Sequence, residues 1–487
     1  MTVRRTTDFL VPLAPALLLF VVLAAFVAVD PPTGFTSSSS PFTDEAWDII
    51  NARNFVLFGH WSTDDWNLYL LNFPFSVSEA AMFSVAGVGI VQARVISIVA
   101  TALTVFVLGA GLRSALGRGP ALLAAAAFGS AALVLYYGRL AYLEPLVALG
   151  VTLGTVGAIR ATGPSSGRWG VVSGLALALA IGTKPSALFV SIGLLIGIAV
   201  VLGRSSPAAR RWLIGAVAAI GLAGLAWLVV LGLEHRLAIG GDLRIWASEP
   251  LSTTPFGWVR RILGFPFRND HMLTLAAPLL IGAGVGAELA IRRRQSLTPT
   301  VRGLVGGAIG SLLLGYAVLA AVPYRPNRYE VPLLPAMAIL TAVAWNLIAH
   351  AVGRRWGPQR WRLVGALVIV GLVLPGVVLF AGWMRVTNAS LPAIQTEVAS
   401  IIPPGAAVEG IYAPLFAMKA PAITLVSRPW AGINTGDLYA VRNVRWYIGA
   451  KGTRPGWAAS HPTEWTARQE RLCAPWGLTT VCVWQVP

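Results

Sequence analysis

The sequence predicts a polytopic α-helical membrane protein that carries a small α/β domain outside the membrane at its C-terminal end. Of its 487 residues, 56% are hydrophobic and only 12% are charged, and the mean hydropathy is +0.70. Soluble domains carry about 25% charged residues, so this composition is typical of membrane proteins. Long apolar segments recur up to residue 383, arginine gathers in every second loop between them, and residues 384–487 contain no further span.

The apolar segments are long enough to cross a bilayer, which takes roughly 20 residues and at least about 17. We predict eleven spans, of which the fourth and fifth are short. They are residues 9–29, 88–110, 120–137, 143–159, 169–183, 185–203, 212–233, 272–291, 303–322, 331–350 and 363–383. The first follows Arg4 and Arg5 as a signal peptide would, but it lacks a small-residue cleavage site. We therefore expect it to be retained as a span.

Arginine in the loops predicts the orientation, because short Arg-rich loops stay in the cytoplasm. Six clusters fall on one side of the eleven spans when the N-terminus is cytoplasmic. They are Arg4 and Arg5; Arg113 and Arg118; Arg160 and Arg168; Arg204, Arg210 and Arg211; Arg292, Arg293, Arg294 and Arg302; and Arg354, Arg355, Arg360 and Arg362. This orientation signal accounts for the net charge of +17, so we expect no nucleic-acid partner. It predicts a multi-pass protein of the cell (inner or plasma) membrane with its C-terminal domain outside.

We divide the chain into a membrane module, residues 1–383, and an extracytoplasmic domain, residues 384–487. The loop after the first span, residues 30–87, is acidic, and we expect interfacial helices in it. Trp47, Ile50 and Phe58 share one helical face there, whereas Asp44, Asp48 and Asn51 share another. This pattern is typical of a helix whose apolar side lies on lipid or on the bundle.

The C-terminal domain shows a mixed helix and strand pattern. We expect helices at Leu391–Ile402 and around Gly436–Arg445, and strands at Val408–Ile411, Thr424–Ser427, Trp446–Gly449 and Thr480–Gln485. Cys473 and Cys482 flank a hairpin turn at Pro475-Trp476-Gly477 on the oxidising side of the membrane. A disulfide and two free thiols both stay open at this point. Neither cysteine has metal-ligand spacing with a histidine.

An adjacent carboxylate pair, Asp44 and Glu45, follows the first span on its outer side. A carboxylate can take the proton of an acceptor hydroxyl, or it can bind a divalent cation. The alternative is structural, because acidic residues also suit the first turn of a helix.

Other charged residues lie at the outer ends of spans. Glu144 begins an apolar span five residues after Arg139, and an unpaired acid there costs on the order of 2–3 kcal/mol. Lys184 ends the fifth span and is the only lysine of the membrane region, so it could neutralise a phosphate. The structural alternatives are an Arg139–Glu144 pair and a lysine that extends to the membrane surface.

The joint between the ninth and tenth spans holds Arg325, Arg328 and Tyr329 on the outer side, against the orientation rule. Guanidinium groups can bind a phosphate there, or Glu330 can pair with them. Arg94 near the outer end of the second span is a further candidate, and the charged loop at 234–271 is a weaker one. These exceptions converge on one face of the membrane. A shared site for an anionic, membrane-anchored substrate accounts for these charged residues better than a separate structural role for each of them does.

These residues resemble the motifs of the GT-C glycosyltransferases, in the branch of the protein O-mannosyltransferases (glycosyltransferase family 39) and aminoarabinose transferases. The resemblance covers nearly the whole chain and rests on short motifs in matching order. They are Asp44-Glu45, Gly89-(x4)-Arg94, Arg139-(x4)-Glu144, Gly182-Thr-Lys184-Pro185, Arg328-Tyr329-(x2)-Leu333-Leu334-Pro335 and Ile402-Pro403-Pro404-Gly405.

The resemblance implies an inverting transfer outside the cytoplasm, in the cell envelope. The donor would be a polyprenyl-phosphate-linked sugar, and the acceptor a glycan, lipid or protein. Asp44 is then the catalytic base, and Glu45 and Glu144 assist substrate binding or hold a metal. Lys184 and Arg328, with Arg94 as a further candidate, steady the leaving phosphate. Some relatives need a divalent metal such as Mg²⁺ or Mn²⁺, and the metal question stays open.

Two other functions compete with transfer. A transporter or flippase of a lipid-linked sugar would share the phosphate site without needing a base, but the sequence shows no inverted repeat or matched pair of broken helices. A membrane-anchored binding protein would place its activity in the C-terminal domain, where no acid–base constellation is evident.

Overall fold

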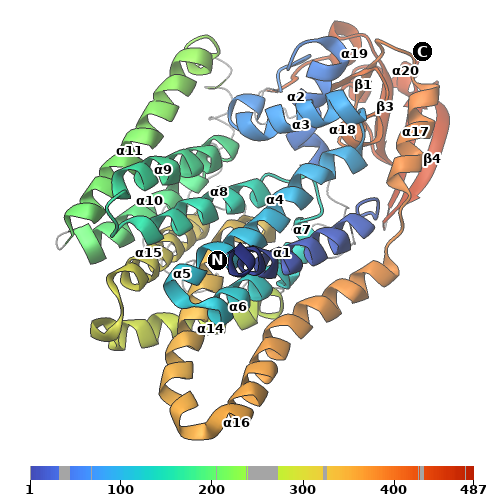
Figure 1. The fold of residues 1–487 in the computed structure, drawn as a ribbon. Helices are drawn as coiled ribbons and strands as arrows, with labels where there is room; N and C mark the ends of the chain where they lie inside the picture. Colours follow the sequence, from blue (N-terminus) through green and yellow to red (C-terminus); the bar gives the residue numbers. More distant parts are fainter. Residues whose placement is uncertain are drawn as a thin grey trace.

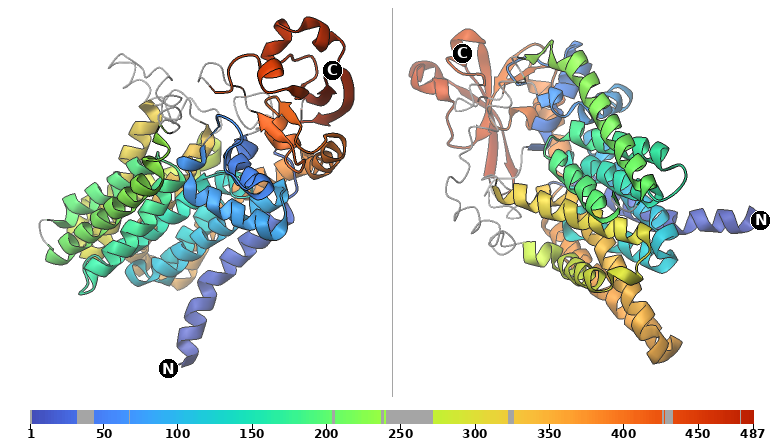
Figure 2. Two further views of the ribbon diagram at one scale, coloured as in Figure 1. Left: turned by 90° about the horizontal axis from the view of Figure 1, so that it is seen from above. Right: turned by 90° about the vertical axis from the view of Figure 1, so that its left-hand side faces the viewer.

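The computed structural model describes residues 2–31, 44–66, 68–203, 206–236, 239, 272–321, 326–425, 427, 433–477 and 479–487. Within these residues a helical bundle precedes a five-stranded sheet. The bundle and the C-terminal domain form two adjacent masses in Figure 1, and both views of Figure 2 show the start of α1 projecting away from the C-terminal domain.

Each predicted span coincides with helix in the described part of the chain. The bundle helices are α1 (Thr2–Ala25), α4 (Ile90–Gly111), α6 (Arg118–Gly129), α7 (Ala132–Tyr137), α8 (Glu144–Gly157), α9 (Ser166–Thr183), α10 (Ala187–Ile198), α11 (Pro207–Trp227), α14 (Met272–Arg292), α15 (Pro299–Ala321) and α16 (Leu334–Val386). Among the described residues, five helical stretches are long and apolar enough to cross a membrane by length and composition. The integral-membrane class follows, and the number eleven stays a prediction.

Two span boundaries differ from the sequence prediction. The predicted spans 331–350 and 363–383 belong to the single helix α16, which Figure 1 shows as two limbs that turn back on each other. The predicted span 120–137 is instead broken into α6 and α7 around Ser130 and Ala131. Apolar periodicity locates segments that suit a membrane, but it does not reveal whether the polar link between two of them stays helical.

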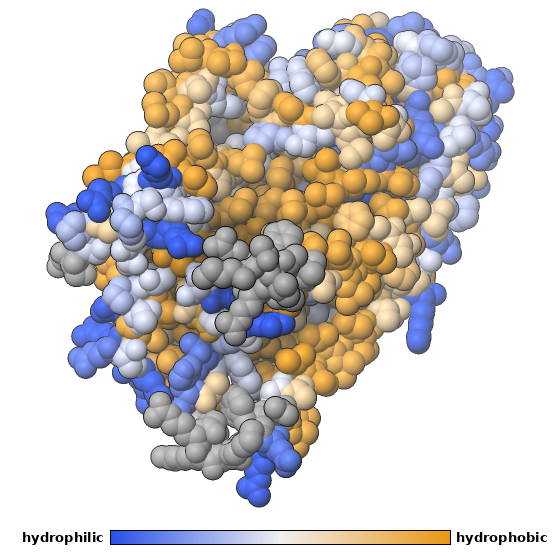
Figure 3. All heavy atoms as spheres, in the orientation of Figure 1, coloured by the Kyte–Doolittle hydropathy of each residue, from blue (hydrophilic) through white to orange (hydrophobic). Residues whose placement is uncertain are grey.

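Glycines bring some bundle helices into direct backbone contact. A Cβ atom on Gly197 would lie 1.9 Å from the carbonyl oxygen of Gly306, and one on Gly193 would lie 2.2 Å from that of Gly310. Small residues at such crossings are typical of helices packed within a membrane. Apolar side chains also cover much of the bundle face in Figure 3. Among the apolar side chains of α11, Val217, Leu222 and Leu225 are exposed.

The C-terminal domain is a mixed sheet in the order β2-β1-β3-β5-β4. Its strands are β1 (Ala407–Glu409), β2 (Ile423–Leu425), β3 (Val444–Ala450), β4 (Gln469–Trp476) and β5 (Thr479–Gln485), and its first helix is α17 (Leu391–Ile401). β1 pairs in parallel with β2 and β3, whereas β5 runs antiparallel to β3 and β4. The sequence analysis missed β4, and the helix expected at 436–445 is only the turn-length α19 (Leu438–Val441).

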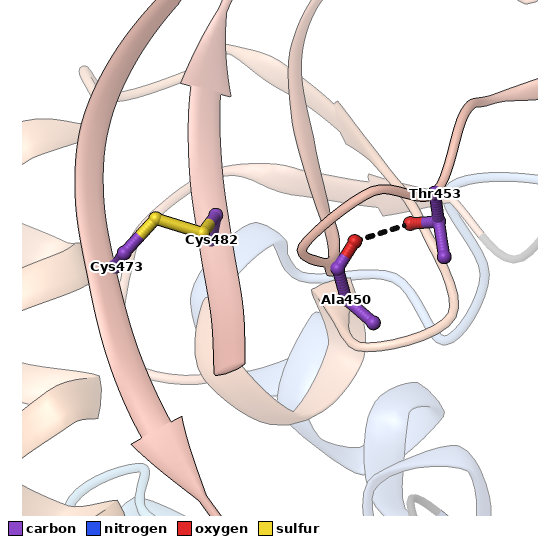
Figure 4. The surroundings of a disulfide bond; sticks show 4 residues. All are labelled: Ala450, Thr453, Cys473 and Cys482. Carbon is purple, nitrogen blue, oxygen red and sulfur yellow. Dashed lines mark hydrogen bonds between the residues drawn. A yellow bond between two sulfur atoms is a disulfide. The ribbon is translucent and has the colours of Figure 1, made fainter. Parts of the chain in front are cut away.

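A disulfide joins the two cysteines. Cys473 and Cys482 stand opposite each other in the β4–β5 ladder, and Figure 4 shows the bond across the two strands. Beside it, the Thr453 hydroxyl donates to the carbonyl oxygen of Ala450 at 2.7 Å and closes the turn after β3. Of the two alternatives that the sequence left open, the structure has the disulfide.

The outer loop forms α2 (Asp44–Phe58) and α3 (Phe73–Ala86), and Figure 1 shows both between the bundle and the C-terminal domain. The apolar side of α2 faces protein: Trp47 and Ile50 form a buried cluster with Trp66 and with Ile433 of the C-terminal domain. A helix lying at the interface was expected from the sequence, and its apolar face turns out to pack on the C-terminal domain.

Candidate active site

Four element ends meet at one place in the bundle and bring four charged side chains together. Asp44 begins α2, Glu144 begins α8, Lys184 follows the last residue of α9, and Arg328 lies in the 3-10 helix η6 (Asn327–Leu333) ahead of α16. We call these four residues the outer charge cluster. Helix starts favour acids, and the two basic residues complete the charge balance.

Arg328 bridges the two acids of the cluster. Its Nη2 atom lies 2.7 Å from Oδ2 of Asp44, and its Nε atom lies 3.4 Å from Oε1 of Glu144. Lys184 Nζ donates to the same Oε1 of Glu144 at 2.5 Å. The second carboxylate oxygen of Glu144 is buried and has no hydrogen-bond partner among the described residues. The cluster thus holds two cations close together, and Oε2 of Glu144 remains as a hydrogen-bond acceptor without a described partner.

Aromatic rings form one wall of the outer charge cluster. Lys184 Nζ lies 3.6 Å from the ring centroid of Tyr329. The guanidinium carbon of Arg328 lies 5.0 Å from the ring of Tyr142 and 5.4 Å from that of Tyr329. Rings at these distances stabilise both cations and exclude water from one side. The sequence motif had included Tyr329, whereas nothing in the spacing had indicated the part played by Tyr142.

The two neighbouring carboxylates at the start of α2 have different surroundings. The Asp44 side chain keeps 20% of its surface exposed, whereas Glu45 is fully buried. Glu45 accepts from Nε and Nη2 of Arg94 at 2.9 and 2.8 Å, and from the backbone N–H of Ala141 at 2.8 Å. Asp44 is therefore the member of the pair that can meet a substrate, a distinction that one sequence cannot make.

Arg94 and Arg139 turn away from the outer charge cluster. Arg94 Nη1 donates to the carbonyl oxygens of Val27 and Val29, and Arg139 donates to those of Val29 and Asp30. Both side chains are fully buried and hold the chain that leaves α1 against α4 and the α7–α8 connection. The structural alternative, an Arg139–Glu144 pair, is absent from the described ion pairs, since Glu144 pairs with Lys184 and Arg328 instead.

Asp48 is a further acid beside the cluster. No role for this residue was expected from the sequence. It follows Asp44 by one turn of α2, so both side chains lie on one face of the helix. Burial raises the pKa of Asp48 to about 8; the nearby Arg328 opposes this rise, and the charges of Glu144 and Asp44 add to it. An i, i+4 pair of acids after the first span is the sequence signal that could have found it.

The remaining residues predicted for the site are Arg325, the loop at 234–271 and Glu330. Arg325 and most of the charged loop at 234–271 fall outside the described residues. Glu330 is buried one residue beyond Tyr329, and within the described chain it is not an ion-pair partner of Arg328.

A metal finds no ready set of ligands in the cluster. Among the described residues, one group of three His, Cys, Asp or Glu side chains has its ligand atoms close enough to share an ion, and it consists of Glu470, Cys473 and Cys482. Its two cysteines form the disulfide. The outer charge cluster is built instead to neutralise a singly or doubly charged anion by two cations, next to a carboxylate that can accept a proton.

Comparison with known proteins connects this geometry to one class of enzyme. A family model described as dolichyl-phosphate-mannose-protein mannosyltransferase matches residues 78–230, which include Arg94, Arg139, Glu144 and Lys184. No curated protein matches the chain by sequence. The predicted resemblance to glycosyltransferases is confirmed by this family model over the part of the chain that it covers.

Solved structures share the fold over most of the chain. ArnT from Cupriavidus metallidurans, solved with undecaprenyl phosphate, is similar with a TM-score of 0.64 and 15% identity, over 99% of this chain and 98% of that one. The oligosaccharyltransferase AglB from Archaeoglobus fulgidus, solved with an inhibitory peptide and a dolichol-phosphate, gives 0.55 and 11%, over 89% and 69%. The arabinofuranosyltransferase AftD from Mycobacteria gives 0.55 and 16%, over 98% and 41%. The chain therefore has the GT-C fold.

Proposed function

We propose that the protein is an integral-membrane inverting glycosyltransferase that moves a sugar from a polyprenyl-phosphate donor to an extracytoplasmic glycan, lipid or protein. The enzyme class rests on the family model over residues 78–230 and on the fold shared with ArnT along nearly both chains. The observation that carries the site is the pairing of Asp44 with Arg328, beside Lys184 and Glu144.

Lys184 and Arg328 are the groups that would bind the donor phosphate. Both are buried cations, and a phosphate between them would replace or share the carboxylates that they hold in the ligand-free protein. The leaving phosphate gains negative charge as the sugar departs, and fixed cations in a dry cleft stabilise that charge. Glu144 Oε2 is free to accept a hydrogen bond from a sugar hydroxyl.

Asp44 is the proposed base. As the acceptor oxygen attacks the anomeric carbon, the bond from that carbon to the phosphate oxygen breaks, and the acceptor proton passes to Asp44. The polyprenyl phosphate leaves with the electron pair on the oxygen that was bonded to the sugar, and the configuration at the anomeric carbon is inverted. Arg328 holds Asp44 at 2.7 Å, and a bound phosphate would compete for this guanidinium, so the donor would release the Asp44 carboxylate toward the acceptor hydroxyl.

The reaction is placed on the outer side of the cell membrane, with the N-terminus inside and the C-terminal domain outside, as the arginine distribution indicates. We assign no step to a metal, because no group of three ligands is present in the described cluster. A requirement for Mg²⁺ or Mn²⁺ stays a prediction that treatment with a chelator addresses.

A transfer assay with purified protein in lipid nanodiscs tests this function. Undecaprenyl phosphates that carry radiolabelled hexoses or pentoses are offered one by one, with washed cell-envelope membranes as the acceptor source. We expect label in the acceptor fraction for at least one donor, together with release of undecaprenyl phosphate. Movement of intact donor across the bilayer without release would instead indicate a flippase, which neither the family model nor the shared fold supports.

A further inference from the structure

Arg53 is a buried cation in the helix that begins with the proposed base, and among the described residues its hydrogen bonds go to backbone oxygens of the C-terminal domain and to one neighbouring amide. Its guanidinium donates to the carbonyl oxygens of Met418, Ala417, Ala420 and Ala422 at 2.7, 3.2, 2.5 and 2.8 Å. Its Nη1 atom donates to Oδ1 of Asn54 at 2.9 Å. The side chain is fully buried, and in the part of the chain that the structure describes no carboxylate pairs with it.

The turn that Arg53 binds follows the short helix α18 (Ala413–Phe416) and leads into β2. Five donors in a rigid planar fork suit several carbonyl oxygens that point to one centre, which a single lysine ammonium cannot match. The same face of α2 places Ala46, Ile49 and Ala52 in one apolar core with Val408, Leu415 and Phe416 of the domain. α2 is thus joined to the C-terminal domain by the Arg53 hydrogen bonds and by this apolar core.

A second attachment lies on the loop that follows α2. Asn434 of the domain donates from its backbone N–H to Asp65 at 3.1 Å and from its side chain to Asp64 at 2.7 Å. Asn434 has a φ of 44°, a left-handed conformation in which Asn is favoured among non-glycine residues. The loop returns to α2, because Asn51 donates to the carbonyl oxygens of Trp61 and Trp66 at 2.9 Å each.

The membrane module holds the other end of α2. Glu45 binds Arg94 of α4, and Asp44 binds Arg328 of η6, so the first turn is fixed by the bundle. Arg53 lies nine residues further along the helix, about 13 Å from Asp44 at 1.5 Å per residue. The position of the Asp44 carboxylate over the outer charge cluster therefore depends on both ends.

We propose that Arg53 is a positioning residue through which the C-terminal domain holds α2, so that Asp44 is set over the phosphate-binding cations. This inference rests on the proposed function, in which Asp44 is the base. The C-terminal domain then helps to position the active site, because the backbone carbonyls of residues 417–422 hold Arg53 and with it α2. Binding of the donor phosphate does not depend on Arg53, because the two cations that would hold it, Lys184 and Arg328, belong to elements of the bundle.

Arg53→Met, which keeps the length of the side chain and removes its donors, tests the inference in the full-length protein. We expect kcat for sugar transfer to fall at least tenfold. The affinity for undecaprenyl phosphate should change less than threefold, as measured by the shift that this ligand causes in the unfolding temperature of the purified protein. Hydrogen exchange should rise in α2 and stay unchanged in α4 and α8. Arg53→Lys should lose less than Arg53→Met. Arg471→Met makes the same change at an exposed arginine whose hydrogen bonds, within the described chain, go to Gln485, and it should behave as wild type.

A double variant separates positioning from general damage to the fold. In an Asp44→Asn background, Arg53→Met should lower transfer by less than twofold further, because its effect acts through the same carboxylate. Equal losses in both backgrounds, or a loss of undecaprenyl phosphate binding together with kcat, would overturn the inference. Normal kcat for Arg53→Met would overturn it as well and leave the proposed function standing. No transfer by the wild type, with Arg53→Met still raising exchange in α2 alone, would overturn the proposed function instead.

Discussion

Arg328 donates to Asp44 across 2.7 Å and so joins the first residue of α2 to the turn that precedes α16. The same guanidinium reaches Glu144, which also holds Lys184. Two acids and two cations therefore share one small volume at the outer ends of four elements. An anionic ligand would enter this volume by taking over the cations, and in doing so it would loosen Asp44 from Arg328.

Removal of either phosphate-binding cation should weaken donor binding. Lys184→Ala and Arg328→Ala should each lower the affinity for undecaprenyl phosphate by about 10- to 100-fold, the range expected when a hydrogen bond to a charged group is lost. Titration of the purified protein with undecaprenyl phosphate measures the change. Arg292→Ala, at an exposed pair with Glu288, is the matched control and should bind normally. Unchanged affinity in both Lys184→Ala and Arg328→Ala would place the phosphate elsewhere.

Asp48 should make donor binding depend on pH. Its pKa is raised to about 8, so the carboxyl is mostly neutral at pH 7 and ionises as the pH passes 8. The new negative charge stands near Lys184 and Arg328 and repels a phosphate, so affinity for undecaprenyl phosphate should fall above pH 8. Asp48→Asn should flatten this fall between pH 7 and 9. An unaltered pH profile in Asp48→Asn would show that another group titrates.

The raised pKa of Asp48 also makes the free energy of unfolding depend on pH. Asp48 binds its proton more tightly in the folded chain than in the unfolded one, where the pKa is near 3.9. Its contribution to the free energy of unfolding is therefore full below about pH 4 and is lost as the pH rises to about 8. Asp48→Asn should consequently stabilise the protein most at alkaline pH.

Glu45→Gln should lower the free energy of unfolding, and we expect this loss of stability to be its main effect. The substitution leaves Arg94 buried without its bidentate partner, and breaking a buried ion pair in this way costs about 3–5 kcal/mol. Thermal unfolding in detergent measures the loss. Glu288→Gln breaks an exposed i, i+4 pair and should cost less than about 1 kcal/mol. If Glu45→Gln unfolds like wild type but transfers poorly, Glu45 belongs to the catalytic groups after all.

The disulfide between Cys473 and Cys482 should form in the mature protein and stabilise the domain by about 2–3 kcal/mol, given the short loop that it closes. Intact-mass analysis without reductant should show both thiols blocked. The double Cys→Ser variant should lower the unfolding temperature of the domain, with little effect on the affinity for undecaprenyl phosphate. Two thiols that alkylate freely in the native protein would contradict the pairing.

The apolar pattern of the sequence was sufficient for the bundle because burial in a bilayer demands long uniform segments. It failed where a local signal was ambiguous. β4 contains Pro475 and exposed charged residues, and it lies at the edge of the sheet, where both are tolerated. The helix expected near residue 440 shortened to α19, since Asn443 adopts a φ of 51° that ends it.

The site could be predicted in part. Charges that are costly in an apolar segment marked Glu144 and Lys184, and the structure brings both into the outer charge cluster. The same reasoning selected Arg94 and Arg139, which instead bind backbone carbonyls near the end of α1. Arg53 gave no signal, because its partners are main-chain oxygens more than 360 residues away in the sequence, and no residue type reveals them.

Asp44 is proposed to accept the proton of the acceptor over a phosphate held by Lys184 and Arg328. Single-turnover transfer by Asp44→Asn, started from protein saturated with a radiolabelled undecaprenyl-phosphate sugar, measures this role. The amide keeps the size of the side chain but cannot act as a base at neutral pH. If Asp44 is the base, the donor still binds and the transfer rate falls by about 10²-fold or more. Transfer at a near-normal rate by the donor-saturated Asp44→Asn protein would show that Asp44 is not the base.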